Sequence, residues 1–138
     1  MIDSAPMPLD PAYFETRFRC DGPLPVWPTR FAIISAHATT GERWDATREV
    51  TADAALHAAL LARGAWMTRV TGYSPTTEHA EPSWAAAIPF DAACDLGATF
   101  PPDAIYWVDG DTLGVSRCTG DRTIVPVGAF RARIDATD

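Results

Sequence analysis

Residues 31–36 read Phe-Ala-Ile-Ile-Ser-Ala, and this stretch decides the fold prediction. The run is almost wholly apolar, has the length of a strand, and lies between Pro28 and Gly41. A continuous apolar run of this length is typical of a strand buried on both faces. We therefore expect it to be the central strand of a sheet.

The residues after this strand predict a long helix. Thr39 and Glu42 have the spacing of a capping box at its start, and Gly64 suits a position just past its end. An alternative is a break at residues 50–51, where Thr51 caps a shorter helix. The apolar stripe expected to face the core comprises Val50, Ala54, His57 and Leu61, widened by Leu56 and Leu60.

Short apolar or alternating runs predict the remaining strands, and capping residues predict two short helices. Asp109-Gly110-Asp111 is a hairpin signal. Residues 72–82 have no periodicity and are expected to form a long connection, the first place to look for function. The strands are expected at 16–20, 65–70, 83–88, 104–108, 112–118 and 123–127, and the short helices at 11–15 and 92–98.

Together these elements predict an α+β fold, with a mixed, mostly antiparallel sheet packed against one long helix and one or two short ones. The 138 residues, 47% of them hydrophobic, suffice for one domain with one ordinary core. We expect residues 1–10, which are rich in proline, to be flexible and residues 11–138 to form the domain.

The charge balance limits the partners. Acidic residues outnumber basic ones by 18 to 11, which gives a net charge of −7, and no lysine is present. Such a lysine-free composition is typical of a GC-rich coding bias. Without a basic tract, neither nucleic acid nor a membrane surface is an expected partner.

The cysteines and the N-terminus point to the cytoplasm. Cys20, Cys94 and Cys118 are far apart and odd in number, so we expect three free thiols rather than disulfides or a zinc site. Residues 1–11 lack the charge and hydropathy pattern of a secretion signal. No common cofactor or nucleotide motif occurs, so we expect no cofactor and no metal.

The ordered elements resemble an uncharacterised bacterial family, the domain of unknown function 3293. The resemblance covers residues 31–113 and implies the fold, but it brings no established activity. This chain departs from the family at Ala38-Thr39, where the family tends to carry Asn-Pro. The matching stretches are FAIISAHATTG (31–41), LHAALLARG (56–64), RVTGYS (69–74), AEPSW (80–84), DAACDLGATF (91–100) and AIYWVDGDTL (104–113).

His37 is the first candidate for chemistry because it follows the buried strand and precedes the expected helix. Thr39, Thr40 and the Gly41 amide could hold an anion at the helix N-terminus, with His37 as acid, base or hydrogen-bond donor. The alternative is a strand-end histidine bonded to a backbone carbonyl.

Glu78, His79 and Glu81 form a second candidate group in the expected long connection. At this density they could bind an ion or transfer protons, although their spacing matches no metal motif. Glu81 is the most restrained because Pro82 follows it. Its alternative role is an ion pair with an arginine such as Arg69.

Tryptophans supply a third candidate. We expect Trp27, among prolines, and Trp44, near the helix start, to be partly exposed and to form an interaction surface. Trp66, Trp84 and Trp107 fall in or beside apolar strands and are expected in the core.

Two functions remain open. The first is a non-enzymatic domain that binds a protein or a small anionic ligand. The second is a small enzyme acting on an anionic metabolite or nucleotide, with His37 and Glu81 as its acid–base pair. Convergence of these two side chains in a pocket would favour the enzyme.

Overall fold

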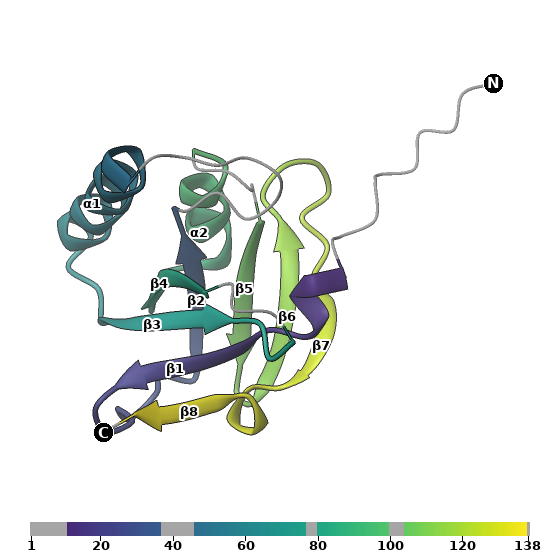
Figure 1. Cartoon of the computed structure of the whole chain (residues 1–138). Helices are drawn as coiled ribbons and strands as arrows, with labels where there is room; N and C mark the ends of the chain where they lie inside the picture. The colour runs from purple at the N-terminus through teal and green to yellow at the C-terminus, as the bar shows by residue number, and fades with distance from the viewer. Residues whose placement is uncertain (1–10, 37–45, 77–79, 100–103, 138) are drawn as a thin grey trace.

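The computed structural model describes residues 11–36, 46–76, 80–99 and 104–137. Within these ranges the chain forms a single eight-stranded sheet, two α-helices and two short 3₁₀ helices (Figure 1). The α+β prediction is therefore confirmed. The elements are η1 (Pro11–Phe14), β1 (Arg17–Asp21), β2 (Arg30–Ser35), α1 (Ala46–Ala62), β3 (Met67–Tyr73), β4 (Ala80–Ala86), α2 (Phe90–Gly97), β5 (Ala104–Asp109), β6 (Thr112–Arg117), β7 (Val125–Ala129), η2 (Phe130–Ala132) and β8 (Ile134–Thr137).

The strand order is β7-β6-β5-β2-β4-β3-β1-β8, so β2 lies in the middle of the sheet between β5 and β4. Four consecutive β2 residues, from Phe31 to Ile34, are at most 2% exposed. The central, doubly buried strand predicted for residues 31–36 is thus confirmed. All strand pairs are antiparallel except β1 with β8, which run parallel.

The sheet bends round until its two edges approach each other. A flat eight-stranded sheet would hold β7 and β8 about 34 Å apart. Only five residue steps separate Ala129 at the end of β7 from Ile134 at the start of β8, and these span at most about 18 Å. Figure 1 shows the consequence, since β1, β3 and β8 run across the direction of β5 and β6.

Each face of the sheet has its own core. On the convex face, α1 and α2 cover the sheet (Figure 1), and Leu56, Leu60 and Cys94 of these helices share a core with Ala32, Ile34, Ile105 and Cys118. On the inner face, the bend encloses an aromatic cluster. This inner core contains Phe18, Phe31, Phe130, Val70, Val108 and Leu113, with Trp27, Trp66 and Tyr106 packed at its margin.

The core-facing side of α1 differs from the predicted stripe. Leu56 and Leu60 are buried as expected, but Val50 is 67% exposed and Leu61 59%. The helix is also continuous through residues 50–51, so the alternative break is wrong. The sheet explains why a different side of α1 faces inward. The helix places Asp53 and His57 against Arg69 and Trp84 of the sheet.

The expected long connection over 72–82 is wrong as well. Gly72 pairs with Glu81 and Tyr73 with Ala80, so β3 and β4 form a hairpin whose connecting segment is residues 74–79. Backbone pairing between the strands satisfies groups that a loop would leave to solvent. Glu81 therefore belongs to a strand and not to a loop.

Two other expectations need correction. The helix predicted at 92–98 was expected to face the core with Ala93, Leu96 and Phe100, but α2 buries Ala93, Cys94 and Gly97, and Leu96 is only partly buried; Phe100 lies outside the described residues. Trp66, Trp84 and Trp107 are also only partly buried, like Trp27, because the indole rings lie at the margins of the two cores. The predicted Asp109–Asp111 hairpin between β5 and β6 is confirmed, with Gly110 at φ +65°.

Candidate functional site

Most of the predicted site residues lie outside the described ranges. His37, Thr39, Thr40, Gly41 and Trp44 fall within residues 37–45, and Glu78 and His79 within 77–79. The criterion that His37 and Glu81 converge in a pocket therefore depends on a residue outside the described ranges. Glu81 and Trp27 are the two candidates that the structure places.

Glu81 is half-buried near the start of β4. The Ser35 hydroxyl lies 3.3 Å from Glu81 Oε1 and also 3.3 Å from the carbonyl oxygen of Pro82. Arg69, the arginine considered as a partner for Glu81, instead forms an ion pair with Asp53. Glu81 thus belongs to a polar group that includes the end of the central strand.

Tyr106 lies close to this polar group. Its hydroxyl donates a 3.1 Å hydrogen bond to the Tyr13 carbonyl, which ties η1 to the inner face of the sheet. Burial raises the pKa of Tyr106 well above its usual value, and the charges of Tyr13 and Glu81 add to the effect. The phenol therefore stays protonated and acts as a hydrogen-bond donor.

The convex face carries a second polar cluster, which the sequence analysis did not predict. Asp53 accepts two 2.8 Å hydrogen bonds from Arg69 and one of 3.2 Å from the Trp84 indole. The Arg69 guanidinium lies 4.3 Å from the Trp84 ring centre, and His57 stacks on the same ring at 4.3 Å. The spacing of Asp53 and His57, one helical turn apart, was the only available signal. Because these four side chains contact one another, the cluster holds α1 against the sheet.

Trp27 stands at the opening of the inner core. Its ring stacks on Phe31 with centroids 5.2 Å apart, and it meets Phe130 edge-on at 5.0 Å. These contacts hold the indole in place although it follows a proline-rich segment with no regular structure. One part of the ring therefore remains available to solvent in a fixed orientation.

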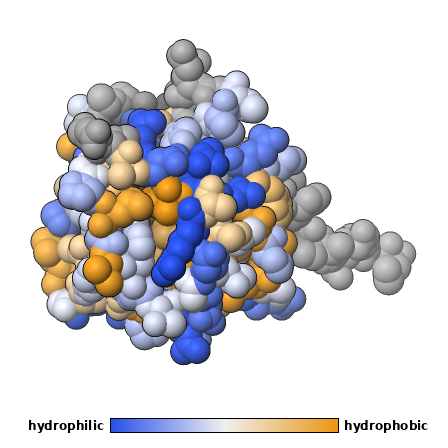
Figure 2. All heavy atoms as spheres, turned by 90° about the horizontal axis from the view of Figure 1, so that it is seen from below, coloured by the Kyte–Doolittle hydropathy of each residue, from blue (hydrophilic) through white to orange (hydrophobic). Residues whose placement is uncertain are grey.

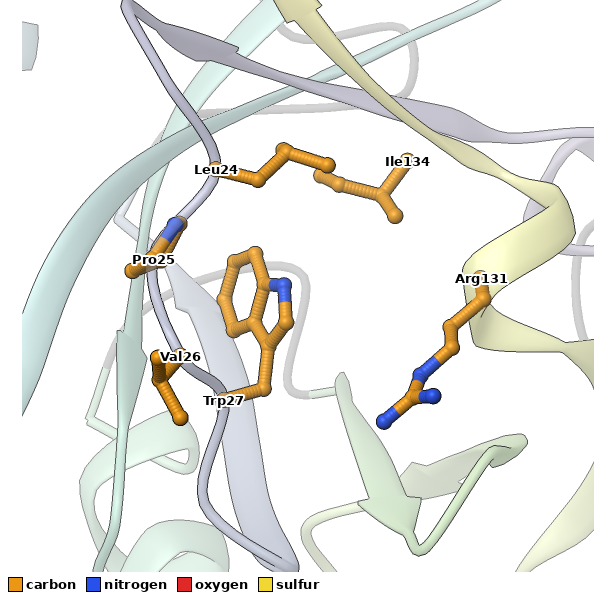
Figure 3. A pocket seen from close by; sticks show the side chains of 6 residues that line it. All are labelled: Leu24, Pro25, Val26, Trp27, Arg131 and Ile134. Atoms are coloured by element: carbon orange, nitrogen blue, oxygen red, sulfur yellow. The ribbon is translucent and has the colours of Figure 1, made fainter.

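A depression of about 340 Å³ lies against this exposed part of Trp27. Figure 3 shows Trp27 on one side and the Arg131 side chain on the other, with the nitrogen-bearing edge of the indole turned toward the space between them. From below, the molecule shows apolar patches interrupted by strongly hydrophilic side chains (Figure 2). The lining of the depression has the same mixed character and comprises Leu24, Pro25, Val26, Trp27, Arg131 and Ile134.

The walls of the depression are unusually open for apolar side chains. Val26 is 93% exposed and Leu24 is 44% exposed, while Ile134 forms a buried floor at 8%. Within the described ranges, no protein group accepts a hydrogen bond from the Trp27 indole or from the Arg131 guanidinium. The depression thus offers apolar contact beside two available donors.

The described residues hold no cluster of three or more metal-ligating side chains. None of the helices that the structure describes has the length and apolar character needed to cross a membrane. No family model, no curated protein and no solved structure matches the chain.

Proposed function

We propose that this protein is a non-enzymatic binding domain and that its binding surface is the Trp27 depression. The observation that carries the proposal is the pairing of exposed apolar walls with donors that the described part of the fold leaves unused. Single exposed apolar residues are common on protein surfaces and need no explanation. Here, however, Leu24 and Val26 flank a hollow that also contains a rigidly held tryptophan.

The local sequence explains why this surface is preformed. Pro23, Pro25 and Pro28 restrict the backbone of the segment before β2, so little conformational entropy is lost when a partner binds. Packing of Trp27 on Phe31 and Phe130 fixes its far end to the inner core. Rigid aromatic anchors of this kind are typical of binding hot spots.

A second candidate function is a small enzyme acting on an anionic metabolite or nucleotide. Its support is the Ser35–Glu81 contact at the end of β2, since His37 follows Ser35 by two positions in the sequence. In this proposal His37 and Glu81 are the acid–base pair, and Thr39 and Thr40 hold the anion. Native mass spectrometry of protein from its own host tests it, because a co-purified anion lost in His37→Ala and Glu81→Gln would favour the enzyme.

Site-specific photo-cross-linking tests the binding domain. Benzoylphenylalanine is introduced at Val26, beside the depression, or at Leu61, an exposed apolar position on α1. In cells of the native host we expect discrete protein adducts from position 26 and none from position 61. Equal adducts at both positions, or adducts only at 61, would contradict the proposed surface.

We also propose that the protein is cytoplasmic and bacterial, and that it shares its fold with the domain of unknown function 3293 family. Three buried free cysteines support the reducing compartment. The family proposal rests on the matching stretches of residues 31–113.

A further inference from the structure

We propose that the Trp27 depression binds the C-terminal residue of a partner polypeptide, with an apolar last side chain and a free carboxylate. This inference rests on the proposed function and specifies its ligand. Its three supports are an available cation, an apolar hollow large enough for the last residue, and a backbone segment outside the sheet with unused amide groups.

Arg131 is the cation. Arg17, Arg69 and Arg122 each bind a carboxylate of the protein, and Arg133 donates to backbone carbonyls. By contrast, the Arg131 guanidinium meets no acceptor in the part of the chain that the structure describes. Its backbone is nevertheless fixed, because its amide donates a 2.7 Å hydrogen bond to Asp111. An anchored but unpaired guanidinium suits a carboxylate from outside.

The Trp27 indole supplies a second donor from the opposite wall. Its Nε1–H faces the space toward Arg131 and Ile134 (Figure 3). A carboxylate accepts hydrogen bonds from either kind of donor, so the guanidinium and the indole are two places at which the ligand's carboxylate can bind.

The hollow is large enough for one apolar side chain together with its terminal carboxylate. Its volume of about 340 Å³ is near the lower end of the range for small-molecule pockets. The hollow is also open to solvent on one side. Leu24, Val26 and Ile134 provide the apolar contact. An open hollow of this size fits the end of a chain, whose preceding residues must leave the site.

The segment beside the hollow can receive those preceding residues. Within the described ranges, the amides of Leu24, Val26 and Trp27 donate to no backbone carbonyl, and the intervening prolines have no amide to donate. Residues 24–28 belong to no strand. An extended peptide could therefore pair with this backbone as a short added strand.

The overall charge selects a single carboxylate over an acidic peptide. The protein carries a net charge of −7, and Arg131 is the cation in the lining of the hollow. A peptide with several acidic side chains would be repelled by the rest of the surface. A peptide with uncharged, apolar side chains at its C-terminus brings only the negative charge of its terminal carboxylate, which Arg131 can neutralise.

The test is a titration of the ¹⁵N-labelled full chain followed by the indole N–H signals in NMR spectra. The Trp27 signal is assigned from its loss in Trp27→Phe. The probes are a pool of acetylated tetrapeptides, Ser-Ala-Thr followed by Leu, Ile, Val or Phe, as free acids and as C-terminal amides. A third probe, 4-methylpentanoate, presents the same kind of apolar carboxylate without a peptide.

We expect the free-acid peptides to shift the Trp27 indole signal and to bind about tenfold or more tightly than the amides, as loss of a charge-assisted hydrogen bond implies. Arg131→Gln should lower the affinity for the free-acid peptides by the same factor. Arg63→Gln, which removes an exposed arginine just after α1, should leave the affinity unchanged.

Other outcomes overturn the inference in recognisable ways. Equal affinities for the acids and the amides would show that the protein does not recognise the carboxylate. Tight binding of 4-methylpentanoate alone would point to a small-molecule ligand. No shift with any probe would also overturn it. If position 26 still gave protein cross-links in these cases, the depression would be a binding surface for a different ligand. If it gave none, the proposed function itself would be wrong.

Discussion

Asp53 on α1 and Arg69 on β3 form a two-point ion pair, with both nitrogen–oxygen distances at 2.8 Å. The same carboxylate accepts from the Trp84 indole, and the same guanidinium lies over the Trp84 ring. One helix and two strands are thus joined by one continuous set of contacts. Among the α1 side chains that the structure describes, Leu56 and Leu60 are the buried ones, so these polar contacts matter for the position of the helix on the sheet.

Asp53→Asn should lower the free energy of unfolding by about 1–2 kcal/mol, because it removes the charge that Arg69 and Trp84 share. The estimate is modest because the Arg69 side chain is 38% exposed. Urea denaturation measures the change. Arg30→Gln is the matched control, since its pair with Asp109 is 69% and 54% exposed and should contribute less than about 0.5 kcal/mol. Equal losses in both variants would contradict this account.

Gly97→Ala should destabilise the protein although alanine favours helices. A Cβ at this position would overlap Cys118 Sγ and would lie 2.7 Å from Ile105 Cγ2. Overpacking of this kind costs about 1–3 kcal/mol, more than the roughly 1 kcal/mol gained from helix propensity. Thermal unfolding of Gly97→Ala beside Ala98→Ser, an exposed change next to the same helix, measures the difference. A raised melting temperature for Gly97→Ala would show that the helix can move away.

Tyr106 should make the protein sensitive to alkali. Burial raises its folded-state pKa above the ordinary tyrosine value of about 10, so its contribution to stability is present below about pH 10 and is lost as the pH rises. Absorbance of tyrosinate during a pH titration should show one phenol that ionises only as the protein unfolds. Tyr106→Phe should abolish this late step and shift the onset of alkaline unfolding to higher pH. A late step that persists in Tyr106→Phe would assign it to another tyrosine.

The three cysteines should resist thiol reagents in the native state. Cys20, Cys94 and Cys118 are at most 4% exposed, and burial raises the pKa of the Cys20 and Cys94 thiols. Both effects lower the amount of accessible thiolate, which is the reactive form. A disulfide reagent should therefore label none of them rapidly in buffer and all three in guanidinium chloride. Rapid labelling of one cysteine in buffer would reveal local opening at that position.

The local sequence pattern predicted an element correctly where the residues of that segment alone decide its structure. The run at residues 31–36 is apolar at nearly every position, so it had to be covered on both faces, and β2 is the result. The hairpin at Asp109–Asp111 is equally local, because a tight turn needs only its own residues. Trp27 was singled out for a similar reason, since prolines exclude it from regular structure.

The face of α1 could not be read from the helix alone. Val50 and Leu61 are as apolar as Leu56 and Leu60, and only the sheet beneath decides which pair is buried. Asp53 enters that interface because Arg69 and Trp84 lie opposite one another on β3 and β4. A register between strands is a long-range property, so no local pattern predicts it.

The sequence by itself determined the α+β class, the central strand, the net negative charge without a linear basic tract, and the interest of Trp27, because each follows from composition or from a few neighbouring residues. Only the tertiary structure decided that Arg131, more than one hundred positions away in the chain, shares a hollow with Trp27. The physical reason is the bend of the sheet. The short path from β7 to β8 draws the two edges together and brings η2 beside the proline-rich segment that precedes β2.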